Sequence, residues 1–521
     1  MARHDNLQEV EVTEQVMLLP DDEYNKTLLD NVHPAGWVNP QPSGPYNIVV
    51  IGAGTAGLVT AAIAAGVGAK VALIEKHLMG GDCLNVGCVP SKGIIRASRA
   101  WAQVQNSEEF GIHIPGTVKY DFGEAMARMR RLRAQISRTD SAHRYKGLGV
   151  DVFIGEGHFS GPDTIEVEGT TLTFKKAAIC TGARAAAPTI EGLREAGYLT
   201  NETIFSLTDL PHRLGVIGAG PIGAEMAQCF ARFGSRVTVL ERMSHVLPRE
   251  DADAAEIVQR RMMRDGVQFI FDSKIARVAS RGNEKVIYYE MHGSMKELVV
   301  DQILVGIGRA PNVEGLGLEK VGVECTDSGV KVNTRLQTTN ARIYAAGDIC
   351  SAFKFTHAAD AMAQVLIQNA LFPHPFGLAY AGTDSLLMPW CTYTQPEIAH
   401  VGLYEADAKA KGWDVETFTY KLDEVDRAIL DSEEEGFARI HVRKGTDKIL
   451  GATIVAAHAG EMISEFTVLM KTGQGLKTLT STIHPYPTQA EVIKKVGNAW
   501  RKANFTESQK NILKKWFAWT R

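Results

Sequence analysis

The sequence lacks the features that mark secreted proteins, membrane-spanning proteins and proteins with a structural zinc site. Its 521 residues include seven cysteines, an odd and small number for this length, which argues against a secreted disulfide framework. No stretch approaches the roughly eighteen consecutive apolar residues of a membrane span. The polar, acidic segment 1–16 also has no apolar core of the kind that signal peptides carry. We therefore expect a cytoplasmic protein without a membrane partner.

Long basic runs are absent as well. The chain carries 56 Lys and Arg against 60 Asp and Glu, a formal net charge of −4, and this balance argues against nucleic-acid binding. The hydrophobic content of 45% is ordinary for a globular protein. A chain of this length is expected to form about three domains.

The most informative segment that is present runs from Gly80 to Lys92, Gly-Gly-Asp-Cys-Leu-Asn-Val-Gly-Cys-Val-Pro-Ser-Lys. Cys83 and Cys88 stand five positions apart at the predicted start of a helix, whose positive end favours a thiolate over a thiol. Glycines around them let the backbone approach a flat cofactor closely. Since the second cysteine pair of a four-cysteine zinc site is missing, we interpret the two residues as a redox-active pair.

The sequence also contains two copies of a strand, a glycine-rich turn, a helix and a second strand that ends in an acid. In both copies the acid lies 23 residues after the first glycine, close to the spacing of about 20 expected for a ribose-binding acid. The N–H groups at each helix start favour a pyrophosphate. The predicted dinucleotide contacts are Gly52, Gly54, Gly57 and Glu75 in the first copy, and Gly218, Gly220, Gly223 and Glu241 in the second.

The Gly80–Lys92 run resembles the signature of the FAD-dependent pyridine nucleotide–disulfide oxidoreductases, a family that includes glutathione reductase, dihydrolipoamide dehydrogenase and mercuric reductase. The resemblance covers about residues 46 to 505. It implies an α/β fold with two Rossmann-like dinucleotide-binding domains and a C-terminal α+β dimerisation domain. FAD would bind the first copy of the repeat and NADH or NADPH the second, in a homodimer with shared active sites.

The resemblance also implies domain limits and further cofactor contacts. The division is an N-terminal extension (1–44), a first FAD-binding part (45–190), an NAD(P)-binding domain (191–310), a second FAD-binding part (311–380), and a dimerisation domain with a C-terminal tail (381–521). Residues 178–183 resemble the family's Ala-Thr-Gly turn, and residues 343–348 resemble its second flavin fingerprint. The additional cofactor contacts predicted are Lys92, Thr181, Gly182, Arg242, Gly308, Gly347 and Asp348.

Catalytic roles follow from the same resemblance. Electrons would pass from NAD(P)H through the flavin to the cysteine pair, with Cys83 as the interchange thiol and Cys88 as the flavin-proximal thiolate. Such a pair suits the chemistry, because one thiolate attacks and the other resolves the mixed species. Lys92 and Glu225 match positions that form an ion pair near the N5 edge of the flavin.

The segment 483–491 departs from the disulfide reductases, which carry His-Pro-Thr followed by a Glu, with that His as acid–base catalyst. Aligned on the Pro-Thr pair, the histidine position holds Tyr486, while Glu491 keeps the place of the acid. A tyrosine with an ordinary pKa near 10 is a poor proton shuttle for a thiol at neutral pH. His484 lies two residues earlier, displaced by about 6–7 Å along an extended segment, which is too far to substitute without a backbone shift.

A tyrosine at this position is a property of mercuric reductases, which carry a second tyrosine in a segment that residues 143–147 resemble around Tyr145. On this interpretation Cys83, Cys88, Tyr145 and Tyr486 would contact a transient substrate ion. Two features point away from that branch: the tail 516–521 has no vicinal cysteine pair, and a separate N-terminal domain with Cys-x-x-Cys is missing. Cys391 fits packing better than a third metal thiol.

Two further questions stay open at the level of sequence. Glu241 favours NADH by pairing with a ribose 2′-hydroxyl, whereas the adjacent Arg242 stands where NADPH-dependent relatives bind the phosphate. We favour NADH, with NADPH as the alternative. The preferred substrate is Hg(II) or a similar thiophilic metal ion, because a cysteine pair is a soft ligand set. The alternatives are a small disulfide of the glutathione or lipoamide kind, with His484 moving in as base, and a flavoprotein that senses thiol redox state.

Overall fold

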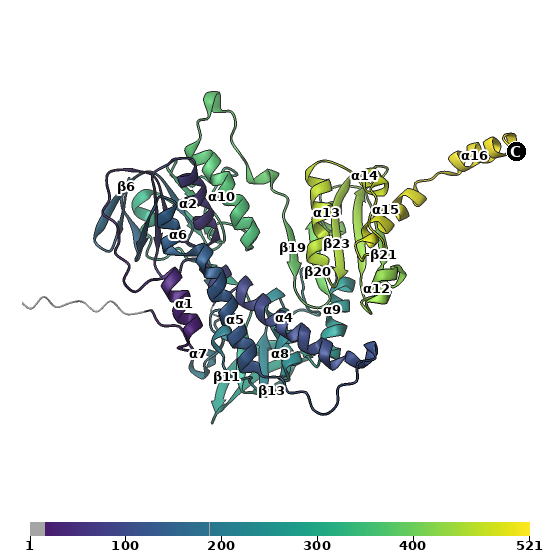
Figure 1. The fold of residues 1–521 in the computed structure, drawn as a ribbon, viewed down its shortest axis with the longest axis horizontal. Helices are drawn as coiled ribbons and strands as arrows, with labels where there is room; N and C mark the ends of the chain where they lie inside the picture. Colours follow the sequence, from purple (N-terminus) through teal and green to yellow (C-terminus); the bar gives the residue numbers. More distant parts are fainter. Residues whose placement is uncertain (1–15, 187) are drawn as a thin grey trace, which may run out of the picture.

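The computed structural model describes residues 16–186 and 188–521, which form three α/β units (Figure 1). The first unit is a largely parallel sheet made of β1 (Tyr46–Ile51), β2 (Val71–Glu75), β3 (Val150–Ile154), β4 (Gly157–Gly161), β5 (Thr164–Val167), β6 (Thr170–Ile179) and β18 (Ile343–Ala345). The strand order is β3-β2-β1-β6-β5-β4, with β18 beside β6. β1 is an apolar run buried on both faces, as a central parallel strand must be. α2 (Thr55–Gly66) and α10 (Thr356–Leu371) pack against each other over one face.

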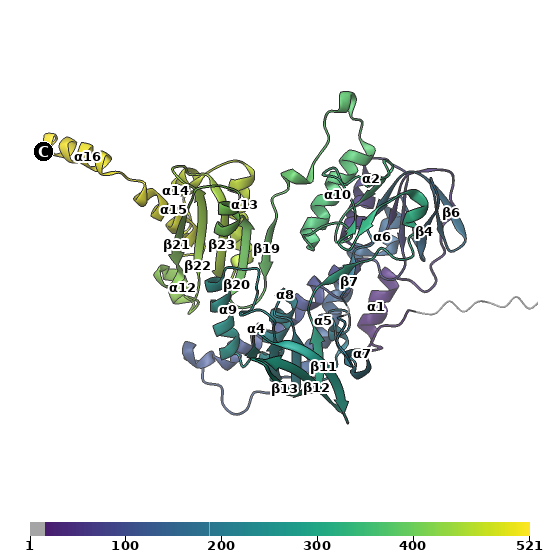
Figure 2. The same ribbon diagram turned by 180° about the vertical axis from the view of Figure 1, so that it is seen from behind.

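The second unit repeats this plan on a smaller scale. Its parallel sheet has the strand order β10-β9-β8-β14. The strand β8 is followed by the helix α8, where the sequence repeat predicts a helix. An antiparallel three-stranded sheet, β11-β12-β13, lies at its outer side (Figure 2). The elements are β8 (Arg213–Ile217), α8 (Pro221–Phe233), β9 (Arg236–Leu240), α9 (Ala252–Arg264), β10 (Gln268–Ile270), β11 (Lys274–Arg281), β12 (Glu284–Met291), β13 (Ser294–Val300) and β14 (Gln302–Val305).

The third unit is an antiparallel five-stranded sheet with the order β19-β20-β23-β22-β21. β22 and β23 form an antiparallel hairpin, and Phe466 of α13 is fully buried against this sheet. The elements are β19 (Pro389–Thr392), β20 (Glu397–Gly402), β21 (Val415–Lys421), β22 (Phe437–Arg443), β23 (Ile449–Ala456), α11 (Glu405–Ala410), α12 (Asp426–Leu430), α13 (Ala459–Lys471), α14 (Leu476–Ser481), α15 (Glu491–Ala503) and α16 (Glu507–Trp519).

Helices from the first part of the chain tie the units together. α4 (Cys88–Gln105) leaves the first unit and packs along α8 of the second unit, and α5 (Phe122–Ile136) packs against α4 and α1. α1 (Glu23–Val32), in the predicted N-terminal extension, has Leu28 and Val32 fully buried in the first core, and Asn25 accepts a hydrogen bond from Arg133 of α5 at 2.6 Å. The described part of this extension is therefore integrated into the body.

Across residues 16–186 and 188–521, no helix combines the length and apolar character needed to cross a bilayer.

Candidate active site

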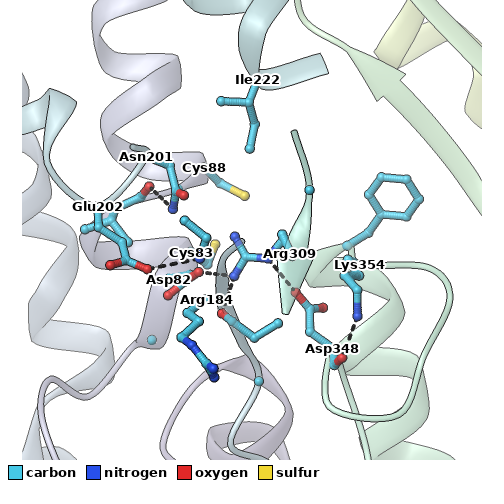
Figure 3. A pocket seen from close by; sticks show the side chains of 18 of the residues that line it. Asp82, Cys83, Cys88, Arg184, Asn201, Glu202, Ile222, Arg309, Asp348 and Lys354 are labelled. Carbon is cyan, nitrogen blue, oxygen red and sulfur yellow. Dashed lines mark hydrogen bonds and ion pairs between the residues drawn. The ribbon is translucent and has the colours of Figure 1, made fainter. Parts of the chain in front are cut away.

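A single large cleft of about 2540 Å³ runs between the first two units and reaches the edge of the third. Both glycine-rich turns and the cysteine motif line it. So do the other predicted residues Lys92, Thr181, Gly182, Glu225, Arg242, Gly308, Gly347 and Asp348. Figure 3 shows the centre of this cleft, with both thiols and several charged side chains pointing into it. Side chains far apart in the sequence thus share one site.

The first glycine-rich turn joins β1 to α2 and is held by the acid at the end of β2. The Glu75 carboxylate accepts hydrogen bonds from the backbone N–H groups of Ala53, at 2.7 Å, and His77, at 2.8 Å. Gly57 sits so close to the turn that a Cβ there would lie 1.8 Å from the Gly52 carbonyl oxygen. Because α2 has Gly54 as its N-cap and no side chain caps its first turn, the N–H groups there are available to a phosphate.

The second turn reproduces this geometry. Glu241 accepts from the N–H groups of Ala219, at 2.6 Å, and Met243, at 3.0 Å. A Cβ at Gly223 would lie 2.0 Å from the Gly218 carbonyl oxygen. The repeat seen in the sequence is therefore also a repeat of backbone structure, and the two turns offer the same kind of anion-binding site.

The two cysteines lie on consecutive helices beside the first turn. Cys83 belongs to α3 (Gly81–Asn85), and Cys88 is the first residue of α4. A Cβ at Gly81 would lie 2.7 Å from the Gly54 Cα, so a glycine is required for the cysteine motif to approach the first turn this closely. Both thiols are free and accessible from the cleft.

Their surroundings make the two thiols unequal. A hydrogen bond from Cys83 lowers the pKa of Cys88 to about 6, supported by the Thr356 hydroxyl at 3.3 Å and the nearby Lys92 ammonium, while burial opposes the shift. The same hydrogen bond, together with burial, raises the pKa of Cys83 above its usual range. At neutral pH the proton therefore resides on Cys83, and Cys88 is the thiolate.

The predicted ion pair of Lys92 and Glu225 is present, with Nζ and Oε2 3.1 Å apart. Glu225 is almost fully buried, and its second oxygen accepts from the Tyr393 N–H at 2.9 Å. The Lys92 ammonium also lies 4.4 Å from the centroid of the Tyr393 ring. α4, α8 and the segment after β19 thus meet around one ammonium group next to Cys88.

A second charged group in the cleft was not predicted from sequence. Arg309 forms an ion pair with Asp82, the residue before Cys83, and its Nε lies 3.4 Å from the carboxylate of Asp348 (Figure 3). Its guanidinium also donates to the Ala183 carbonyl. One arginine therefore connects the cysteine segment with the predicted flavin fingerprint. The available signal was its position next to Gly308, within a glycine-containing turn.

Comparison with known proteins identifies the family to which a chain with these features belongs. The model for pyridine nucleotide-disulphide oxidoreductases matches residues 46–364, and the model for their dimerisation domain matches residues 388–496. The chain belongs to this family. Mercuric reductase from Staphylococcus aureus is 35% identical over 495 residues, covering 92% of this chain and 89% of that protein. Dihydrolipoyl dehydrogenase from Bacillus subtilis is 31% identical, covering 86% and 96% respectively.

Among solved structures, the HOCl-induced flavoprotein disulfide reductase RclA from Escherichia coli superimposes with a TM-score of 0.77 at 28% identity, covering 87% of this chain and 99% of that chain. The predicted fold class and family are confirmed. The protein is an NAD(P)H-dependent flavoprotein oxidoreductase that uses FAD, and its dimerisation domain supports a homodimer. Relatives named for different activities lie at similar sequence identity, so the family does not decide the substrate.

The residues of the first unit fit FAD on structural grounds. The glycine turn leaves no room for side chains, since a Cβ at Gly52 would lie 2.5 Å from the Cys180 carbonyl oxygen. Thr181 and Asn312 hold the facing turn by reciprocal hydrogen bonds of 2.8 and 2.9 Å between side chains and carbonyls. Asp348 lies opposite, with Arg309 beside it. This combination of bare backbone and fixed polar groups suits a dinucleotide.

The remaining predicted residues lie away from the cleft of their own chain. Tyr486 is 69% exposed on the dimerisation domain and donates to the Asp426 carboxylate at 2.8 Å. Glu491 opens α15 and lies 3.9 Å from Lys495. Tyr145 is buried in the core of the first unit rather than on the cleft wall, and burial raises its pKa to about 12. His484 pairs with Glu465 at 2.9 Å.

Proposed function

We propose that this enzyme reduces a thiophilic metal ion, Hg(II) foremost, at Cys83 and Cys88 with electrons from NAD(P)H. The observation that carries the proposal is a dithiol with one thiolate favoured at neutral pH, in a chain whose acid–base histidine position holds Tyr486. Two sulfurs open to the cleft are a soft ligand pair. We also infer that the reaction takes place in the cytoplasm, where thiols stay reduced.

The chemistry balances without an external proton donor. NAD(P)H and Hg(II) give NAD(P)⁺, one proton and elemental mercury, so two electrons are transferred. FAD, when bound, relays those electrons between the nicotinamide and the metal–dithiol site. Cys88 binds the ion as thiolate, and Cys83 binds it after losing its proton, which Hg(II) drives because a coordinating thiol is deprotonated outright.

The remaining residues position these partners. Lys92, held by Glu225, keeps positive charge beside Cys88, and we assign it to the flavin edge. Tyr486 is proposed to reach the dithiol of the partner subunit and to polarise the bound ion through its phenol oxygen. Glu241 is proposed to favour NADH through the ribose 2′-hydroxyl. Tyr145 has no direct role in this proposal, because its ring is buried in the core.

A second candidate is reduction of a small organic disulfide, favoured by the dihydrolipoyl dehydrogenase relatives. This reaction needs a base near the leaving thiol. His484 would have to break its contact with Glu465 to act as that base.

Copper is a related option for the metal substrate, since solved structures of the neighbour RclA are described as Cu(II) complexes.

The decisive experiment is a substrate screen with the FAD-loaded enzyme. NAD(P)H oxidation is followed with Hg(II) buffered by a small thiol, Cu(II), glutathione disulfide, lipoamide and a quinone, and release of mercury vapour is recorded. We expect turnover with Hg(II), lost in Cys88→Ser and kept in Cys325→Ser, which removes an exposed thiol outside the cleft. Turnover of a disulfide at about 10 per second or more, with no response to Hg(II), would select the second candidate.

A further inference from the structure

The C-terminal helix α16 extends away from the body on the far side of the dimerisation domain (Figures 1 and 2). In the described structure every residue from 501 to 521 is exposed. The helix nonetheless has its own start signal: the Thr506 hydroxyl accepts from the Gln509 N–H, and the Gln509 side chain accepts from the Thr506 N–H. This reciprocal capping favours helix without any tertiary support.

The helix is strongly two-sided. Ile512, Trp516 and Trp519 follow the i, i+4, i+7 spacing of one face, and Leu513 and Phe517 extend that face on one side. All five are open to solvent, with Trp519 76% exposed and the rings of Trp516 and Trp519 5.2 Å apart. An exposed apolar surface of this kind, built largely from aromatic residues, marks an interaction site.

The opposite face carries cations. Lys510, Lys514 and Lys515 stand against one carboxylate, Glu507, in a chain whose net charge is −4, and Arg521 follows just beyond the helix. Within the described residues, Lys514 and Lys515 have no ion-pair partner, whereas Lys510 pairs with Glu507 at 2.6 Å. Cations on one face beside tryptophan and phenylalanine on the other are typical of helices that lie in the headgroup region of a bilayer.

We propose that α16 is an interfacial helix that binds the enzyme to an anionic lipid surface. The apolar face would enter the boundary of the acyl chains while the lysines contact lipid phosphates. The match to the dimerisation domain ends at residue 496, so α16 lies beyond the part of the chain that matches this domain. Such a helix is compatible with the lack of any spanning helix in the described ranges, since it lies on the membrane instead of crossing it.

The test uses the full-length, FAD-loaded enzyme in a vesicle flotation assay. Vesicles of phosphatidylcholine alone are compared with vesicles in which roughly a third of the lipid is phosphatidylglycerol. We expect at least about tenfold more protein on the anionic vesicles, and less as salt is raised. The double variant Trp516→Ser/Trp519→Ser should lose this binding by about tenfold, while Asn511→Ala, on the polar face, should keep it.

Lys514→Glu/Lys515→Glu should remove the preference for anionic over neutral vesicles. FAD content and NAD(P)H oxidation by all variants serve as checks of folding, since α16 lies outside the cleft. Absence of vesicle binding by the wild type, or binding that ignores both double variants, overturns the proposal. So does a dimer that dissociates without lipid in Trp516→Ser/Trp519→Ser, because the apolar face would then belong to a second copy of the chain.

Discussion

The two thiols of the redox pair illustrate how neighbouring residues set chemistry at the scale of one side chain. The pKa of Cys88 is lowered to about 6 and that of Cys83 is raised, so the thiolate of Cys88 persists above about pH 6 and is lost as the pH falls below it. Replacing the ammonium by Lys92→Met should raise the pKa of Cys88 by about one unit. The long-wavelength charge-transfer absorbance of the reduced enzyme, followed against pH, measures this shift.

Lys76→Met is the matched control, because Lys76 also lines the cleft but pairs with Glu156 at 4.0 Å instead of approaching the thiols. An identical titration midpoint in wild type and Lys92→Met would show that Lys92 does not act on Cys88. The band should disappear in Cys88→Ala at every pH. Its survival there would assign the thiolate to Cys83.

We propose that single residues also decide the choice between NADH and NADPH. Glu241 stands at the end of β9 with its carboxylate in the cleft, where it would repel a 2′-phosphate. Glu241→Ala should therefore raise kcat/KM for NADPH relative to NADH by roughly tenfold. Arg242→Ala should shift the same ratio in the opposite direction. A ratio unmoved by Glu241→Ala would place the carboxylate away from the ribose.

Single residues also mark the limit of sequence-based prediction here. The Lys92–Glu225 pair was predicted by matching both residues to a known motif, and the two atoms are indeed 3.1 Å apart. Arg309 and Asp82 are 227 residues apart, and no sequence pattern around either residue predicts that the two form an ion pair. An ion pair of this kind depends on how whole domains dock, which local spacing does not encode.

At the scale of secondary-structure elements, the glycine turns make a steric prediction. In Gly223→Ala the new Cβ would lie 2.0 Å from the Gly218 carbonyl oxygen, so α8 must move away from the turn that would bind the nicotinamide dinucleotide. We expect KM for NAD(P)H to rise about tenfold or more while the FAD content stays normal. In Gly57→Ala, with its Cβ 1.8 Å from the Gly52 oxygen, the FAD content itself should fall.

Gly66→Ala is the control for both variants, because it lies in the last turn of α2 with nothing within 4 Å of its Cβ. It should keep FAD content and KM and raise helix stability slightly. Normal KM in Gly223→Ala would mean that the second turn does not bind the nicotinamide dinucleotide.

Elements were predictable where the signal was local. The strand–glycine–helix units and the β22–β23 hairpin follow from apolar runs and turn residues that lie next to each other in the chain. α1 and α16 were not predicted as helices, because they lie in the segments interpreted only as an N-terminal extension and a C-terminal tail. The apolar spacing of Ile512, Trp516 and Trp519 was present in the sequence, but windows for membrane spans do not detect an amphipathic surface helix.

At the scale of the whole molecule, the proposed mechanism divides the active site between two subunits. The cleft brings both nucleotide turns and the dithiol together, whereas Tyr486 is exposed on the dimerisation domain and does not line that cleft. In a dimer with twofold symmetry, every contact across the interface occurs twice, once from each subunit to the other. We therefore propose that Tyr486 serves the dithiol of the partner subunit, because it does not line the cleft of its own chain.

This arrangement predicts complementation between two inactive variants. Cys83→Ala and Tyr486→Phe should each lose Hg(II)-dependent NAD(P)H oxidation, since one lacks a metal thiol and the other the phenol oxygen. When the two are unfolded together and refolded, about half of the dimers are mixed, and each mixed dimer has one site with both Cys83 and Tyr486 intact. Activity should return to about a quarter of the wild-type value.

The control mixture of Cys83→Ala with Cys88→Ala should stay inactive, because every site then carries a defect. No recovery in the first mixture would mean that Tyr486 serves the dithiol of its own chain or none.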